Sequence, residues 1–356
     1  MSRVLFPDGP DVGLAWHYGD PLGEQRWLDG DGAVVDLSNR DVICLTGPQR
    51  AEYLDLIGTQ RLAGLAAGQA AWAYLLDGRG QIQNDLHLVE TGQAIWAWTE
   101  PGRGPDLADW LESRKFRLQV EARACPELAL VWASGQAGGL LDLAQTAGWV
   151  TRRGPESLGG AEVLVPRDDL ARALASGQPV GLWGFEARRI AAGLPRLGLD
   201  TDQRTIPNEL GLPSLAVSLD KGCYPGQETV ARVHNLGHPP RRLVRLHLDG
   251  SAERLLASGT PLRLAPSGRS DVPEEPAETD PSGPVGRLGS MSWHWELGPI
   301  GLALVRRQLP QAATVLADEV AGAVEDLVDP EQGRHFRSDL PGRARRRSLG
   351  PIGGPA

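Results

Sequence analysis

Residues 220–235 read Asp-Lys-Gly-Cys-Tyr-Pro-Gly-Gln-Glu-Thr-Val-Ala-Arg-Val-His-Asn, and they gather many polar and reactive side chains into sixteen positions. Lys115 and Lys221 are the only lysines of a chain that otherwise uses arginine for its basic side chains. A compact ammonium and a planar guanidinium are not interchangeable, so Lys221 is expected to have a specific task. Gly222 and Gly226 permit positive φ and close backbone approach. The stretch therefore predicts a polar turn that forms a small site.

Within this turn, exposed backbone N–H groups beside Lys221 would attract an anion and favour the thiolate of Cys223. Gln227 and Glu228 could bind the edge of a polar heterocycle, and Tyr224 is counted with them as a ligand-binding candidate. Lys221 and Cys223 are candidates for chemistry. The alternative is a structural turn between domains, in which Cys223 is buried and inert.

Cys223 has several possible roles. A nucleophilic cysteine usually has a histidine base, and His234 and His238 are close in sequence. A metal site from these three residues would lack a second cysteine pair or a carboxylate anchor, so no metal site is predicted.

Composition narrows the class of protein. The net charge of −9 argues against a general nucleic-acid-coating role, so no direct nucleic-acid partner is expected. Three cysteines without C-x-x-C spacing are typical of free thiols in a reducing compartment. No apolar run is long enough for a membrane span, and the N-terminus lacks the apolar core of a signal peptide. We expect a cytoplasmic protein that does not contact membranes.

Hydrophobic periodicity predicts an α+β fold. Alternating runs at 71–76 and 81–89 flank the turn residues Asp77 to Gly80, which predicts a β-hairpin. Residues 182–191 predict a helix closed by a glycine and a proline. From residue 241 β-like runs dominate, with the next helix at about 311, which indicates a small β-barrel.

These patterns divide the chain into five segments. They are an N-terminal extension (1–30), the first half of an α+β unit (31–135), its second half with the 220–228 motif (136–240), a C-terminal β-barrel with a disordered loop at 266–283 (241–325), and a disordered basic tail (326–356).

Lys221 to Glu228, K-G-C-Y-P-G-Q-E, resembles the K-G-C-[YF]-x-G-Q-E signature of the YgfZ family of folate-binding proteins. These are relatives of the glycine-cleavage T-protein, an aminomethyltransferase. For Cys223 the family suggests redox or sulfur-linked chemistry, or transient contact with a metal cluster, as an alternative to a nucleophile. Residues 46–89, 193–209 and 298–306 resemble further segments of that family in the same order. The resemblance implies a three-domain aminomethyltransferase-like ring, with two α+β folate-binding units, a C-terminal β-barrel and a tetrahydrofolate site at the centre.

The chain departs from the transferase pattern at Asn84-Asp85, where the aminomethyltransferases carry a paired Asp-Asp. If Asp85 faces the cavity, its carboxylate could act as a general base or an electrostatic stabiliser. The alternative is an aspartate on the surface of a strand. The loss of the second carboxylate argues against aminomethyl transfer and leaves folate binding possible.

A second departure is Ala191, which stands where relatives often place a glutamate for the pterin edge. A carboxylate suits the donor face of a pterin. The contact could pass to another acidic residue, and the candidates are Glu186, Asp200, Glu209 and Glu228. Arg188 or Arg189 could hold the glutamate tail of folate, although one of them is expected to be a solvated charge on a helix face.

Three functions remain open. The resemblance implies a tetrahydrofolate-binding protein that supports assembly or repair of iron–sulfur clusters, with iron–sulfur client or assembly proteins, including tRNA-modification enzymes, as partners. The second is a folate-dependent aminomethyl or one-carbon transferase. The third is a folate-regulated binding module without catalysis.

Overall fold

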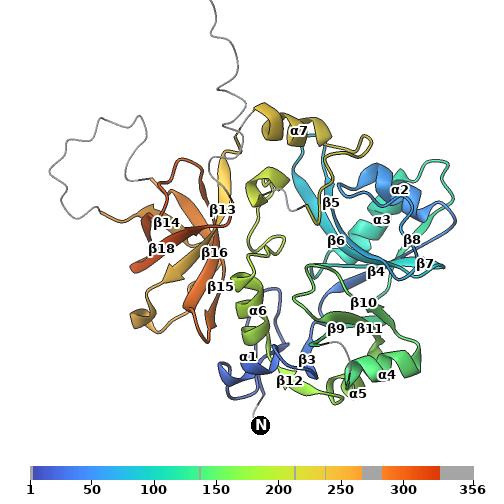
Figure 1. Ribbon diagram of the computed structural model, residues 1–356, viewed down its shortest axis with the longest axis horizontal. Coiled ribbons are helices and arrows are strands. Elements are labelled where there is room, and N and C mark those ends of the chain that lie inside the picture. Colours follow the sequence, from blue (N-terminus) through green and yellow to red (C-terminus); the bar gives the residue numbers. More distant parts are fainter. Residues whose placement is uncertain (1–2, 136–137, 212–213, 237, 267–282, 329–356) are drawn as a thin grey trace, which may run out of the picture.

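The computed structural model describes residues 3–135, 138–211, 214–236, 238–266 and 283–328. Two five-stranded sheets and a closed six-stranded barrel lie around a central segment that contains one long helix (Figure 1). The predicted α+β architecture with a C-terminal barrel is confirmed. Residues 267–282 and 329–356 lie outside the described residues, and with them most of the predicted loop and tail.

The first sheet has the strand order β5-β6-β7-β4-β8 and is antiparallel throughout. Its strands are β5 (Ala70–Leu76), β6 (Ile82–Glu90), β7 (Ala94–Thr99), β4 (Asp41–Thr46) and β8 (Glu121–Ala124). Alternate residues of a strand face opposite sides, so Ala73 and Leu75 pack under the helices α2 (Arg50–Ile57) and α3 (Gly104–Arg114). Trp72 and Tyr74 face the centre of the ring.

The second sheet has the order β10-β11-β9-β3-β12. Its strands are β10 (Val150–Arg152), β11 (Ala161–Pro166), β9 (Leu128–Ala133), β3 (Ala33–Asp36) and β12 (Gln178–Val180). Helices α4 (Leu140–Ala147) and α5 (Leu170–Leu174), with the short 3-10 helix η1 (Arg167–Asp169), cover one face. Because β9 pairs with β11 and β3 pairs with β12, the second sheet takes strands from both sides of the predicted boundary at 135/136.

Helix α6 (Leu182–Ala191) lies between the second sheet and the barrel. It has the predicted bounds, and Gly193, which follows the C-cap Ala192, has a φ of +70° that suits glycine. The N-terminal elements β1 (Val4–Leu5), β2 (Ala15–His17) and α1 (Gly23–Trp27) also pack here, with β2 and α1 on α6. The Trp16 ring stacks on Trp183 of α6 at 4.9 Å between centroids.

The barrel closes in the order β13-β16-β15-β14-β17-β18. Its elements are β13 (Arg241–Leu248), η3 (Gly250–Ala252), β14 (Pro261–Leu264), β15 (Gly286–His294), β16 (Gly298–Arg306), β17 (Thr314–Ala317) and β18 (Val320–Asp326). The helix predicted near residue 311 is wrong. Val315 and Ala317 alternate with more exposed neighbours and face the barrel core, and β18 closes the barrel on β13, so this segment is a hairpin.

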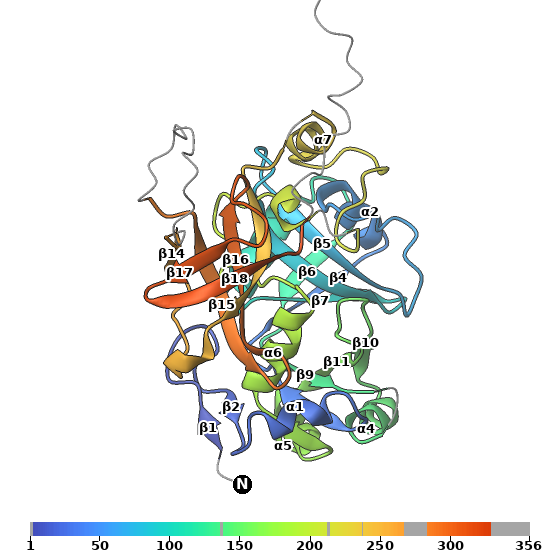
Figure 2. The ribbon, with the colours of Figure 1, turned by 60° about the vertical axis from the view of Figure 1, so that its left-hand side comes forward.

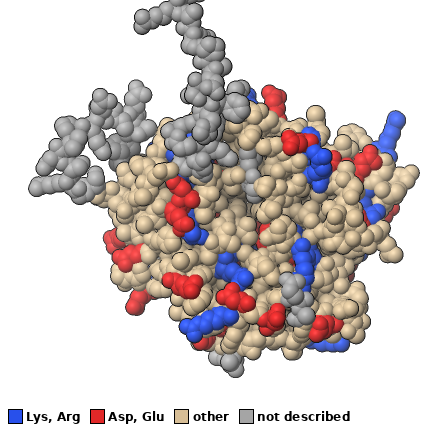
Figure 3. All heavy atoms as spheres, viewed as in Figure 1, with Lys and Arg blue, Asp and Glu red and all other residues tan. Residues whose placement is uncertain are grey.

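The segment 220–235 ends in helix α7 (Gln227–Leu236), which packs against the 3-10 helix η2 (Pro207–Leu210). Figures 1 and 2 both show α7 at the outer end of the β5–β6 hairpin, away from α6. On the face drawn in Figure 3, basic and acidic side chains of the described residues are interspersed, without a continuous basic surface. No helix in the described part of the chain is long and apolar enough to cross a membrane.

Candidate ligand-binding site

A cavity of about 60 Å³ lies where β5–β7, the loop after β10 and helix α6 meet at the centre of the ring. Its walls combine aromatic rings with buried charged groups. The lining residues include Trp72, Asp85, His87, Trp98, Glu100, Glu156, Glu186, Arg189 and Arg196. Three of the predicted site residues are therefore in one place: Asp85, Glu186 and Arg189.

Three aromatic side chains form a stack across neighbouring strands. The sheet register pairs Trp72 with His87 and His87 with Trp98. The His87 ring lies nearly parallel to both indoles, with its centroid 5.3 Å from that of Trp72 and 3.8 Å from that of Trp98. Cross-strand neighbours on one face are close enough for such contacts, so the stack follows directly from the hairpin register.

His87 also lies between two carboxylates. Its Nε2 is 3.4 Å from Oδ2 of Asp85, and its Nδ1 is 2.9 Å from Oε1 of Glu156. Burial alone lowers the pKa of His87, but hydrogen bonds and charge from both carboxylates outweigh burial and raise that pKa. The arrangement favours an imidazolium held between two carboxylates.

Neighbouring groups also keep both carboxylates, Asp85 and Glu156, in the ionised form. Burial alone raises the pKa of Asp85, but His87 and the Thr99 hydroxyl, which donates to Oδ1 at 3.1 Å, keep it below its usual range. Burial likewise opposes ionisation of Glu156, yet His87 and Arg152 lower the pKa of Glu156 to about 2. Asp85 is thus a buried partner of His87 and Thr99, which excludes the alternative of a surface aspartate.

Three buried polar atoms on the cavity wall lack a hydrogen-bond partner among the described residues: Nε1 of Trp72, Nε1 of Trp98 and Oε2 of Glu156. Buried polar atoms in native proteins are nearly always paired, so these atoms indicate a site built for a polar ligand or water. Two donors and one carboxylate acceptor fit the mixed edge of a pterin. The cavity is smaller than the roughly 300–1,000 Å³ of small-molecule sites, so it would have to widen to admit a pterin ring.

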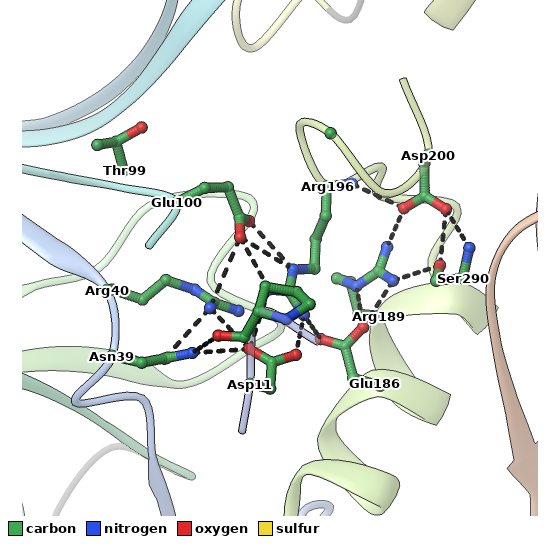
Figure 4. Close-up of polar contacts among 12 residues, drawn as sticks. Asp11, Asn39, Arg40, Thr99, Glu100, Glu186, Arg189, Arg196, Asp200 and Ser290 are labelled. Carbon is green, nitrogen blue, oxygen red and sulfur yellow. Dashed lines mark hydrogen bonds and ion pairs between the residues drawn. The ribbon is translucent and has the colours of Figure 1, made fainter. Parts of the chain in front are cut away.

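The cavity lining also includes part of an ion-pair network on α6 and the segment that follows it (Figure 4). Arg189 donates to Glu186 at 2.7 Å, to Asp200 at 3.0 Å and to the Ser290 hydroxyl of the barrel. Asp200 also accepts from the backbone N–H of Ser290 at 2.7 Å. The predicted candidates Glu186, Arg189 and Asp200 therefore join α6 to the barrel, and Arg189 is not a solvated helix charge.

The same network continues through Arg196. Its guanidinium donates to Glu100 at 2.8 Å, to Glu186 at 3.3 Å and to Asp11 at 2.7 and 3.1 Å. Arg40 contacts Asp11 at 3.1 Å and lies 3.6 Å from Glu100. Burial opposes the ionisation of Asp11, but the charges of Arg196 and Arg40 hold the pKa of its carboxyl well below the usual range.

Glu209 lies elsewhere. It is fully buried on η2 and accepts hydrogen bonds from Arg241, the first residue of β13, at 2.8 Å to each carboxylate oxygen. These bonds attach the barrel to the segment before α7. Glu209 does not line the central cavity.

The 220–228 motif forms a separate site at the outer edge. Lys221 inserts its ammonium among the carbonyl oxygens of Asp55, Gly58 and Gln60, with distances of 2.7 Å to Gly58 and 2.9 Å to Gln60. These carbonyls are at the C-terminus of α2, where the helix dipole favours a cation. Burial lowers the pKa of Lys221, and the Asp55 charge opposes that shift. The ammonium thus donates to backbone carbonyls, whereas the sequence predicted that Lys221 would help to attract an anion.

Cys223 is exposed, as is Glu228 in the first turn of α7. Gln227 reaches back to the carbonyl of Lys221 at 3.4 Å. Tyr224 is buried in the core that joins the first sheet to the barrel, and its ring lies 5.5 Å from the Lys221 ammonium. No cluster of three metal-ligating side chains occurs within the described ranges.

The structure thus separates the predicted site residues into the central cavity, the barrel attachment and the outer motif. Sequence reasoning missed His87, Glu156, Trp72, Trp98 and Arg196. The sequence did contain a signal for His87, since the predicted hairpin places it two residues from Asp85 on the same face of a strand. Glu156 comes from an irregular loop, for which no periodic signal exists.

Comparison with known proteins gives the fold a precedent. The chain superposes on the glycine cleavage system aminomethyltransferase T of Bartonella henselae with a TM-score of 0.72, 20% sequence identity, and coverage of 90% of this chain and 93% of that one. The chain has the aminomethyltransferase fold. No protein-family model matches its sequence.

Two kinds of curated protein are similar to this chain in sequence. An aminomethyltransferase of Stenotrophomonas maltophilia strain K279a is 27% identical over 239 residues, which cover 58% of this chain and 64% of the relative. The human mitochondrial iron–sulfur cluster assembly factor IBA57 is 28% identical over 252 residues, which cover 63% of this chain and 67% of that protein. The chain is therefore homologous to the aminomethyltransferase superfamily, with transferases and an assembly factor among its relatives.

Proposed function

We propose that this protein is a YgfZ-like tetrahydrofolate-binding protein of the cytoplasm, which supports iron–sulfur cluster assembly or repair and thereby tRNA-modification enzymes. The observation that carries folate binding is the central cavity, with its unpaired buried Trp72, Trp98 and Glu156 atoms. The similarity to an assembly factor and the octapeptide from Lys221 to Glu228 support the iron–sulfur role.

In this proposal the cavity residues hold the pterin ring. Glu156 accepts hydrogen bonds from the ring's N–H groups, and the indole N–H groups of Trp72 and Trp98 donate to its acceptor atoms. The bound folate would supply a one-carbon carrier or a reduced heterocycle. His87, held by Asp85 and Glu156, would keep a proton at the cavity wall.

A folate-dependent aminomethyltransferase is the second candidate, favoured by the transferases among the relatives. Against it, Asn84 replaces one carboxylate of the transferase pair, and Asp85 is engaged by His87 and Thr99. Turnover of an aminomethylated carrier protein with tetrahydrofolate to methylene-tetrahydrofolate would establish the transferase and overturn the non-catalytic proposal.

Folate binding is tested by calorimetry and thermal shift with tetrahydrofolate, since a ligand selective for the native state raises its stability. Trp98→Phe keeps the aromatic stack but removes one donor, and we expect it to weaken binding about three- to tenfold. Trp110→Phe, on α3 outside the cavity, is the matched control and is expected to bind as the native protein does. Absence of binding by the native protein would overturn the proposal.

The iron–sulfur role is tested separately in a host that lacks the gene. Cys223→Ala removes an exposed thiol without disturbing the core. We expect the variant to restore an iron–sulfur enzyme's activity poorly, whereas the native protein restores it. Full restoration by Cys223→Ala would exclude a chemical role for this thiol, and failure of the native protein would exclude the assembly role.

A further inference from the structure

The loop between β1 and β2, residues 6–14, delivers the Asp11 carboxylate to the guanidiniums of Arg40 and Arg196 (Figure 4). Four side-chain hydrogen bonds reach this carboxylate: two from Arg196, one from Arg40 at 3.1 Å and one from Asn39 at 2.8 Å. The two guanidiniums are almost fully buried. Such a paired, forked donor set is the geometry that proteins use to recognise the carboxylate of a ligand.

The charges around Asp11 indicate that it is the surplus member of its network. Among the described residues, three guanidiniums (Arg40, Arg189, Arg196) face four carboxylates (Asp11, Glu100, Glu186, Asp200). Without Asp11 the remaining groups would balance in charge. Buried charges require partners. If Asp11 were released, each of the three guanidiniums would still face another carboxylate.

Asp11 also lines a second space, next to the central cavity. A groove of about 500 Å³ lies on the far side of the network, and it shares Glu186 and Arg196 with the lining of the central cavity. The groove is lined by the loop itself and by the stacked Trp16 and Trp183. Its volume falls in the range of small-molecule sites, whereas the cavity alone is too small.

We propose that Arg196, Arg40 and Asn39 form a carboxylate-binding subsite, and that Asp11 is an internal competitor for the carboxylate of a ligand that enters through this groove. The class of ligand is an aromatic or apolar body with a terminal carboxylate. The inference rests on the proposed function in one respect: the aminobenzoylglutamate part of a folate has this chemistry, and the pterin would lie in the cavity beyond.

The experiment measures the affinity of the native protein and of Asp11→Asn for three probes: tetrahydrofolate, 4-aminobenzoylglutamate and 6-methyltetrahydropterin, which has no carboxylate. Removal of an internal competitor should tighten binding of the two carboxylates by about tenfold or more, because the open fraction of the site rises. Affinity for the carboxylate-free pterin should stay the same.

Asp8→Asn is the matched control, because Asp8 is an exposed acid of the same loop that lines the same groove. Equal tightening by Asp8→Asn would identify a general charge effect and overturn the proposal. Unchanged or weaker binding of both carboxylates to a folded Asp11→Asn protein would do the same.

A second measurement needs no variant. The loop amides of Phe6, Gly13 and Leu14 donate backbone hydrogen bonds within the loop, so their hydrogen exchange reports its release. Saturation of the native protein with 4-aminobenzoylglutamate should accelerate their exchange, and slower or unchanged exchange would contradict the competition. If no pterin binds any form, the folate function fails, while the 4-aminobenzoylglutamate result still decides the subsite.

Discussion

Replacing Lys221 by methionine tests whether the most specific motif of the chain has a structural task. Its ammonium donates to the carbonyls of Asp55, Gly58 and Gln60 at the end of α2, and its side chain is 1% exposed. Methionine keeps most of the apolar stem and removes the charge. The change therefore removes the donor from the carbonyl of Asp55 in the last turn of α2 and from those of Gly58 and Gln60 just beyond it.

The magnitude follows from the three contacts. Each unpaired, partly buried carbonyl costs about 1 kcal/mol or more, and a cation at a helix C-terminus adds about 0.3–1 kcal/mol. The native protein recovers less than this sum, because burying an ammonium has a desolvation cost. We expect Lys221→Met to lower the free energy of unfolding by about 2–3 kcal/mol.

Urea denaturation followed by circular dichroism measures this loss, and hydrogen exchange of the α2 amides localises it. Lys115→Met is the matched control, because Lys115 is the other lysine of the chain and pairs with Glu112 at the protein surface. An exposed pair contributes about 0–1 kcal/mol. A loss below about 1 kcal/mol for Lys221→Met, or equal losses for both variants, would refute the structural reasoning.

Two further predictions concern the outer motif and the cavity. Gly226→Ala should destabilise the protein by more than about 1 kcal/mol in urea denaturation, because Gly226 has a φ of +79° and an added Cβ would lie 2.6 Å from the carbonyl oxygen of Asp77; unchanged stability would contradict this close approach. His87 has a raised pKa, so its ion pairs stabilise the fold fully below about pH 6.5 and are lost as pH rises through the folded-state value. Glu156→Gln should lower the pKa of His87 in an imidazole NMR titration, and an unshifted titration would show that Glu156 does not hold the proton.

Local sequence predicted most elements of the fold. The hairpin around Asp77–Gly80, helix α6 and its glycine stop at Gly193 depend on turn chemistry and on 2- and 3.6-residue periods, which are readable without a partner. The helix predicted near residue 311 is wrong because long-range strand pairing, and not local sequence, decides the structure there. Alanine favours a helix locally, but pairing of β17 with β14 and β18, and of β18 with β13, makes this segment a hairpin of the barrel.

The sequence by itself identified the 220–228 motif, the fold class and the acidic and basic candidates around it. Only the tertiary structure decided which of them share a site. Asp85, Glu186 and Arg189 meet at the central cavity, while Lys221 caps α2 at the outer edge. Contacts such as Asp11 with Arg196 or His87 with Glu156 join residues 185 and 69 positions apart. Such pairings arise from the packing of whole sheets and loops, which leaves no periodic trace in the sequence.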